Sequence, residues 1–288
     1  MSVEDYHLKN QLTRNTLALA SCAALTFVLV GSQANARAVP WRVDPNPPNN
    51  VTNVLNSISA SSPGDVWAVG LLDNSPSNPH VLAKHWNGAA WNVVPAPYMQ
   101  SWDTSEFRGV SALARNDVWA VGTFTFRAGI NQQIINSSVI EHFDGVRWSI
   151  IPSPQSNPRT GSEFFLNAVS ALSANDVWAV GFGSAGTNAP LLPLYEHWNG
   201  KVWTAQLGDG SPFPGDLFSV SATSPNDVWA AGSQGGETYD DTYISHWNGQ
   251  KWSRVPTPNR NVQTSHNDLG RFAASRQTTR GPSDMVPY

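Results

Sequence analysis

The chain has 288 residues, with 17 Lys and Arg against 21 Asp and Glu, so its net charge is −4. This charge is too small to attract nucleic acid or acidic membranes, and it also disfavours a phosphate-binding role. Charged residues make up only 13% of the sequence, whereas 13 Trp are many for this length. We therefore expect the fold to be held together by buried aromatic rings rather than by ion pairs.

Residues 1–36 have the three parts of a secretory signal peptide. A polar stretch with two cations (1–15) precedes an apolar stretch (16–31) and the small residues of a cleavage site (34–36). We expect a secreted or cell-surface protein with no membrane association beyond this export signal. An uncleaved anchor and a lipoprotein signal ending at Cys22 are the alternatives. Because Cys22 is the only cysteine, cleavage would leave a chain without disulfides or cysteine-bound metal.

A long-period repeat organises the sequence that follows. The motif Asp-Val-Trp-Ala-Val-Gly occurs four times, with one substitution in the last copy, and an apolar residue lies ten positions before each copy. A second signature then follows in every unit, His-Trp-Asn-Gly or His-Phe-Asp-Gly, with a Trp six residues after the His. The motif Asp residues are Asp65, Asp117, Asp176 and Asp227, and the signature His residues are His85, His142, His197 and His246.

Each unit contains four short segments rich in β-branched and aromatic residues, which we name strands A to D in chain order. Turn residues separate them, and none has the 3.6-residue period of a helix, so each unit is predicted to be a four-stranded antiparallel sheet. Asn-Gly or Asp-Gly between strands C and D predicts a two-residue type I′ turn. One such sheet cannot bury both faces alone, and its repetition therefore predicts a β-propeller.

The predicted fold is thus all-β, a β-propeller of four-stranded antiparallel blades within residues 37–268. It has four complete blades, an orphan N-terminal strand at 41–47 that copies strand D, and a truncated fifth blade. Residues 269–288 form a C-terminal tail that leaves the repeat pattern. The predicted blades span about 55–97, 107–154, 166–208 and 217–258.

The genetic code offers an explanation for the tail. Read one base out of frame, the codons from Ser275 to Met285 can encode Val-Ser-Pro-Asn-Asp-Ala-Trp-Ala-Val-Gly-Tyr, and its Asp would lie ten residues after Leu269. Our hypothesis is that a frameshift near Arg271 and Phe272, real or introduced by a sequencing error, replaced a fifth blade. A natural polar tail is the alternative. Without the fifth blade we expect an exposed sheet edge.

The two repeated motifs resemble those of bacterial secreted β-propeller proteins with DVWAVG and HWNGxxW blades, which are distantly similar to kelch and galactose-oxidase-type blades. The resemblance covers about residues 41–258. It implies a propeller fold and says almost nothing about chemistry, because propellers host many unrelated functions.

The repeated positions themselves are predicted to be structural. Twelve of the 13 Trp occupy them, which indicates packing between sheets rather than ligand binding. The His residues could form a metal ring and the Asp residues could be catalytic acids, but we favour hydrogen-bonded His and turn Asp that accept backbone N–H groups. No metal and no cofactor is predicted. The strand-B members of the Trp set are Trp67, Trp119, Trp178 and Trp229.

Candidate binding residues lie where the B–C and D–A connections meet, because these connections are long and differ in every unit. Two groups there pair an aromatic ring with an acid, as glycan-binding sites do. They are Trp102 with Asp103 and Glu106, and Tyr239 with Asp240. Loop packing is the alternative for both groups. The acidic loop around Asp240 is expected to be solvated, with Ca²⁺ binding as the alternative.

Two functions follow from this surface. The first is a non-catalytic secreted or cell-surface binding scaffold, whose partner is an unknown polysaccharide or protein. The alternative is a glycan-active enzyme, a hydrolase, lyase or oxidase, although the mature chain has no Cys for a Cys-Tyr copper site and no Ser-x-Asp-x-Gly-x-x-Trp box. A truncated fragment without function is the third possibility.

Overall fold

The computed structural model describes residues 52–73, 79–97, 102–128, 132–154, 162–186, 189–210, 214–235 and 240–258. All of them belong to one unit of the chain, Asn46–Tyr288. The predicted signal peptide (1–36), orphan strand (41–47) and aberrant tail (269–288) lie outside the described residues.

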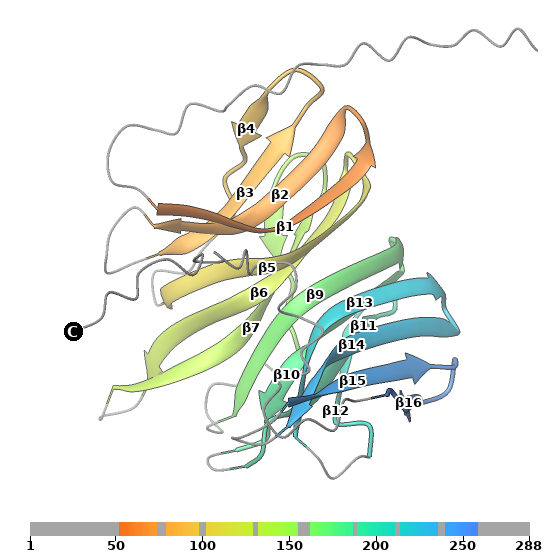
Figure 1. Ribbon diagram of the computed structural model, residues 1–288. Helices are drawn as coiled ribbons and strands as arrows, with labels where there is room; N and C mark the ends of the chain where they lie inside the picture. Colours follow the sequence, from red (N-terminus) through yellow and green to blue (C-terminus); the bar gives the residue numbers. More distant parts are fainter. Residues whose placement is uncertain are drawn as a thin grey trace, which may run out of the picture. The chain divides into compact units, whose positions relative to one another are not determined.

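The described residues form four antiparallel sheets of four strands each (Figure 1). Blade 1 contains β1 (Thr52–Ser62), β2 (Asp65–Asp73), β3 (His80–Trp86) and β4 (Trp91–Val93). Blade 2 contains β5 (Trp102–Ala114), β6 (Asp117–Ala128), β7 (Gln133–Phe143) and β8 (Trp148–Ile150). Blade 3 contains β9 (Glu163–Ser173), β10 (Asp176–Ser184), β11 (Leu192–Trp198) and β12 (Trp203–Leu207). Blade 4 contains β13 (Gly215–Ser224), β14 (Asp227–Gly235), β15 (Asp240–Trp247) and β16 (Trp252–Val255).

The strands of each sheet are hydrogen-bonded in chain order, so every sheet is a simple meander. The first strands β1, β5, β9 and β13 lie next to one another in that order, which makes them the inner strands of successive blades. This arrangement is that of a β-propeller, and the predicted fold class is confirmed for the four blades. The part of the chain that the structure describes has no helix that could span a membrane.

Three hydrophobic cores fill the spaces between successive blades, and a strand-B indole lies in each. The side chains of Trp67, Trp119 and Trp178 are between 0% and 3% exposed. Burial of about 200 Å² per indole contributes on the order of 5 kcal/mol before entropy is subtracted. The fourth member differs from the sequence prediction, because Trp229 is 41% exposed. Blade 4 has no described blade after it to cover this ring.

The inner strands of neighbouring blades belong to different sheets and are joined through serine side chains. Ser57 Oγ accepts a hydrogen bond from the backbone N–H of Val110 at 3.2 Å, and Ser59 Oγ accepts one from Ala112 at 3.0 Å. Ser111 and Ser170 accept equivalent bonds in the next two interfaces. The alternating Ser of strand A therefore aligns each blade with the next.

The Gly that ends each Asp-Val-Trp-Ala-Val-Gly motif faces an inner strand at a bulge. In blade 2, Gly122 pairs with Phe107 beside a register shift. A Cβ at this position would lie 1.9 Å from the carbonyl oxygen of Glu106, and the same clash occurs at the motif Gly of every other blade. No side chain fits there, so the motif ends in glycine for steric reasons.

The predicted two-residue turn between strands C and D was wrong. Trp86 pairs with Trp91, which leaves a four-residue loop, and only Gly88 in it has a positive φ, at 93°. The Asn87 side chain supplies the missing contacts, since its Oδ1 accepts the N–H groups of Ala89 and Ala90 at 3.0 Å. The loop is therefore stabilised by its Asn side chain, and it does not need the two positive-φ residues of a type I′ turn.

Candidate functional site

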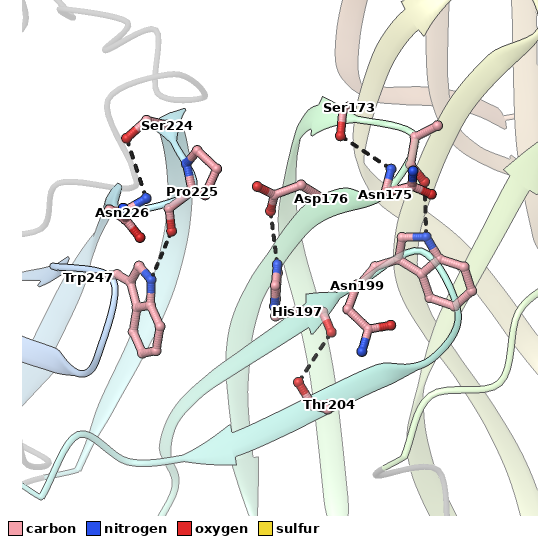
Figure 2. A network of polar contacts seen from close by, with 12 residues as sticks. Ser173, Asn175, Asp176, His197, Asn199, Thr204, Ser224, Pro225, Asn226 and Trp247 are labelled. Atoms are coloured by element: carbon pink, nitrogen blue, oxygen red, sulfur yellow. Dashed lines mark hydrogen bonds and ion pairs between the residues drawn. The ribbon is translucent and has the colours of Figure 1, made fainter.

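In each blade the repeated Asp is hydrogen-bonded to the repeated His, and the His ring lies against the ring of the strand-B Trp. In blade 3, the His197 ring stacks on Trp178 with centroids 4.1 Å apart. His197 Nε2 lies 2.9 Å from Asp176 Oδ1 (Figure 2). The same bond measures 2.6, 2.8 and 2.7 Å in blades 1, 2 and 4. The His residues are thus held by structural hydrogen bonds.

The hydrogen-bond donors to the motif Asp residues differ from the sequence prediction. We expected backbone N–H groups, whereas the carboxylate of Asp65 accepts from the side chains of Ser61 and His85. Burial opposes ionisation of this carboxyl, but the two hydrogen bonds outweigh burial and hold the pKa of Asp65 below its ordinary value. Each Asp therefore fastens the A–B turn to strand C.

Aromatic and charged side chains gather on the inner strands of blades 2 and 3 and on the adjacent strand β10, toward the end where the B–C and D–A connections lie. Arg108 on β5 is central to this group. Its Nε donates to Glu106 Oε1 at 2.7 Å, and its Nη1 donates to Asn167 Oδ1 on β9 at 3.0 Å. The guanidinium also lies over the Phe165 ring, 5.7 Å from the centroid. Phe165 stacks on Phe182 at 4.6 Å.

We call these five residues the inner-strand cluster: Glu106, Arg108, Phe165, Asn167 and Phe182. The ion pair between Arg108 and Glu106 is half-buried, with about a third of each side chain exposed. It therefore presents charge, hydrogen-bonding groups and aromatic carbon on one small surface. Such a surface can hold a ligand by polar contacts beside a stacking platform.

The structure places the sequence-predicted binding residues unequally. Glu106 belongs to the inner-strand cluster, while Asp103 forms a separate, exposed ion pair with Arg127 at 2.9 Å. Trp102 and Asp240 are the first residues of β5 and β15, but their side chains lie outside the described part of the chain, as does all of Tyr239. Neither predicted aromatic–acid pair is thus shown, and only Glu106 is placed beside an aromatic platform.

Arg108, Asn167 and the two Phe residues were missed by the sequence reasoning, although the repeat contained a signal. At the same inner-strand position, Asn56 and Asn167 donate to the carbonyl oxygen of the next inner strand, at 2.7 and 2.8 Å. Blade 2 has Arg108 there instead of Asn. A residue that departs from the pattern at a position where its equivalents serve the fold is a candidate for function.

Two carboxyls are buried between blades instead of facing the connections. Glu141 lies between blades 1 and 2 and Glu196 between blades 2 and 3, and both are 0% exposed. Burial raises the pKa of Glu141 to about 9. Burial also raises the pKa of Glu196, but the hydrogen bond from Ser153 Oγ at 2.8 Å limits the rise to about 7. Because both side chains are fully buried, we assign them to the packing between blades.

A chain of hydroxyl groups crosses the interface between blades 3 and 4. Tyr195 donates to Ser245 Oγ at 2.9 Å, and Tyr243 donates to Asp209 Oδ2 at 2.5 Å. Burial raises the pKa of Tyr195 to about 12 and raises that of Tyr243 as well. Both phenols therefore stay protonated as hydrogen-bond donors. Among the described residues, no group of three or more His, Cys, Asp or Glu is placed to hold a metal ion.

Neither the protein-family models nor the curated proteins with which the sequence was compared give a match. Solved structures with a similar fold include a GH32 beta-fructofuranosidase of the silkworm Bombyx mori, 12% identical over 70% of this chain and 48% of that chain, with a TM-score of 0.42. A point mutant of that enzyme in complex with sucrose is 13% identical over 69% and 48% of the two chains, also with a TM-score of 0.42. This chain spans about half the length of these enzymes.

Proposed function

We propose that the protein is a non-catalytic, secreted binding scaffold that holds an extracellular polymer against the connection end of its blades. The observation that carries this proposal is the inner-strand cluster. It joins two blades, and it combines the stacked rings of Phe165 and Phe182 with the charged pair of Arg108 and Glu106. Its backbone belongs to β-strands, so the platform is rigid before any ligand arrives.

The chemistry of the cluster suits a polymer with both apolar faces and polar edges, and a polysaccharide fits it best. The faces of sugar rings pack on aromatic carbon, while sugar hydroxyl groups exchange hydrogen bonds with carboxylates and guanidinium groups. Glu106 and Arg108 supply the polar groups for this purpose, because about a third of each side chain is exposed.

The test is a binding assay with a panel of soluble and insoluble polysaccharides, using the full chain and two arginine variants. Arg108→Ala should lower affinity for a bound polysaccharide by about tenfold or more, because it removes a charged hydrogen-bonding group from the platform. Arg115→Ala is the matched control. Arg115 lies at the A–B turn, where its Nη2 donates to Gly64 O at 3.4 Å, and its loss should leave affinity unchanged.

Two outcomes of this assay would contradict the proposal. Equal losses for the two variants would place binding away from the inner-strand cluster. Release of reducing ends or unsaturated sugars from the bound polysaccharide would instead make the protein a glycan-active enzyme, which is the alternative function.

A further inference from the structure

The three interfaces inside the chain share one construction. The strand-B indole of a blade enters between two aromatic rings of the next blade, one from the end of strand C and one from the start of strand D. The Trp119 ring lies 5.4 Å from that of Trp198 and 5.6 Å from that of Trp203. The interface between blades 3 and 4 repeats this arrangement at 5.2 and 5.6 Å.

Blade 4 has the inserting indole, but the structure describes no following blade whose rings could receive it. The Trp229 ring stacks on His246 of its own blade at 4.3 Å, and its Nε1 donates to Asp227 at 2.9 Å. Trp119 is oriented by the same two contacts, to His142 at 4.4 Å and to Asp117 at 3.2 Å. Trp229 is thus already in the inserting position, yet 41% of it is exposed.

Blade 1 presents the receiving half. Trp86 and Trp91 lie 6.0 Å apart at an interplanar angle of 49°, and no indole from the described residues lies between them and a preceding blade. Two of the three pairs that receive an indole have this spacing, and the third, Phe143 with Trp148, is 5.4 Å apart at 47°. Trp198 and Trp203 are 6.0 Å apart at 44°, and the pair in blade 4 is 6.0 Å apart at 49°. The receiving pair of blade 1 is therefore preformed.

Aliphatic side chains of blade 1 are also left uncovered. Leu55 and Ile58 on β1 are 51% and 67% exposed, whereas their equivalents on β5, Phe107 and Val110, are 0% and 6% exposed against blade 1. Val93 on β4 is also exposed. Exposed apolar residues gathered on one sheet face indicate an interaction surface. The interior interfaces show that a strand-B face covers this surface.

The chain contains four copies of the motif, the last with Ala in place of the second Val, and three of their indoles pack into the next blade. Among the described residues, Trp229 is the one strand-B indole that no following blade receives, and blade 4 makes no extensive contact with blade 1 of its own chain. We propose that the protein associates head to tail with a second copy of itself, Trp229 of one copy entering between Trp86 and Trp91 of the next. The two surfaces differ, so this interface is heterologous and continues until a ring closes or a filament forms.

Sedimentation velocity of the full chain over a concentration series tests the association. We expect the mean mass to rise above that of the monomer at micromolar concentration. Trp229→Ser removes the inserting indole and Ile58→Asp places a charge on the receiving face, so each variant alone should stay monomeric. Val146→Asp is the matched control, because Val146 is exposed at a C–D turn away from both faces, and this variant should associate as the unmodified chain does.

Mixing the two variants gives the decisive result. Trp229→Ser keeps its receiving face and Ile58→Asp keeps its inserting face, so an equimolar mixture should form a one-to-one dimer and nothing larger. A monomeric unmodified chain at every concentration would overturn the proposal, and so would dimers of either variant alone. A mixture that stays monomeric would also overturn it when both variants keep the melting temperature of the unmodified chain.

Acrylamide quenching of tryptophan fluorescence in the unmodified chain provides a readout that needs no end-face substitution. Quenching should fall as the concentration rises, because association covers Trp229, Trp86 and Trp91. If the segment containing Trp41 covers Trp229 instead, quenching will not depend on concentration and Trp41→Ser will increase it. That result would overturn the proposal in favour of closure within one chain.

Discussion

A single repeat position shows how neighbouring side chains decide the cost of a buried carboxyl. Glu141 and Glu196 both precede the signature His on strand C, and both are fully buried. Glu196 accepts a hydrogen bond from Ser153, whereas neither oxygen of Glu141 has a partner among the described residues. The residue equivalent to Ser153 in the preceding blade is Ala96, which packs against the same core as Glu141's neighbours. Blade 2 thus supplies a hydroxyl to Glu196, whereas blade 1 has no hydroxyl at the equivalent position for Glu141.

Ala96→Ser should therefore stabilise the protein by giving Glu141 the partner that Glu196 already has. A hydrogen bond to a buried polar group contributes about 1 kcal/mol, and we expect a gain of that size in the free energy of unfolding. Urea unfolding at pH 7 measures it. In a Glu141→Leu background the added hydroxyl has no carboxyl to bind, so the gain should disappear. A gain that persists there would rule out this pairing.

The buried carboxyls also predict how stability depends on pH. The folded chain keeps the proton of Glu141 up to pH about 9 and that of Glu196 up to about 7, whereas the unfolded chain releases both near 4.5. Between those values the unfolded state binds fewer protons, so the free energy of unfolding falls as pH rises, by at most about 1.4 kcal/mol per unit and group. The stabilisation is fully present below pH 4.5.

Urea unfolding midpoints measured from pH 5 to pH 9 test this dependence. The midpoint of the unmodified chain should fall across the range, more steeply below pH 7, where both groups contribute. Glu141→Leu should flatten the part between pH 7 and pH 9, because it removes the only group assigned to that window. A midpoint that rises with pH would contradict the burial of these carboxyls as neutral acids.

At the scale of the strand, the repeated motifs predict more of the fold than the connections do. Apolar alternation and β-branched residues place strands A to D, because burial in a sheet has a period of two. The C–D turn was mispredicted because Asn-Gly can form either a two-residue type I′ turn or part of a longer loop. The outcome depends on whether the Asn87 side chain accepts the N–H groups of that loop. That competition between side chain and backbone geometry is not visible in a dipeptide.

The exposure of the strand-B indoles predicts unequal effects of removing them. Trp178→Ala leaves a cavity between the rings of Trp247 and Trp252 and should cost about 3–5 kcal/mol. Trp229→Ala removes a ring that is partly solvated in the monomer and should cost only about 1–2 kcal/mol. Chemical denaturation at a concentration where the chain is monomeric measures both. Equal costs would mean that Trp229 is covered.

For the whole molecule, the repeat predicts the blades and their order. It does not predict that the first and last blades each leave one face uncovered. The four copies of the motif differ only at Ala231, so nothing in the motif predicts that Trp67 is buried and Trp229 exposed. The inner-strand cluster was also hidden, because Arg108 meets Phe165 and Asn167 only after two blades pack. The sequence shows which residue stands at each position, whereas its neighbours in the next blade depend on how the blades pack.

The position of a blade in the array should set its protection from hydrogen exchange. Repeat arrays are stabilised by the interfaces between neighbours, and blades 2 and 3 have two such interfaces while blades 1 and 4 have one among the described residues. In dilute solution, where the chain is monomeric, the amides of β6 and β10 should exchange more slowly than those of β2 and β14. Mass spectrometry of peptides from the four motif copies compares nearly identical sequences, so intrinsic exchange rates largely cancel. Uniform protection across the four copies would mean that the end blades are covered as fully as the inner ones, and it would contradict the 41% exposure of Trp229.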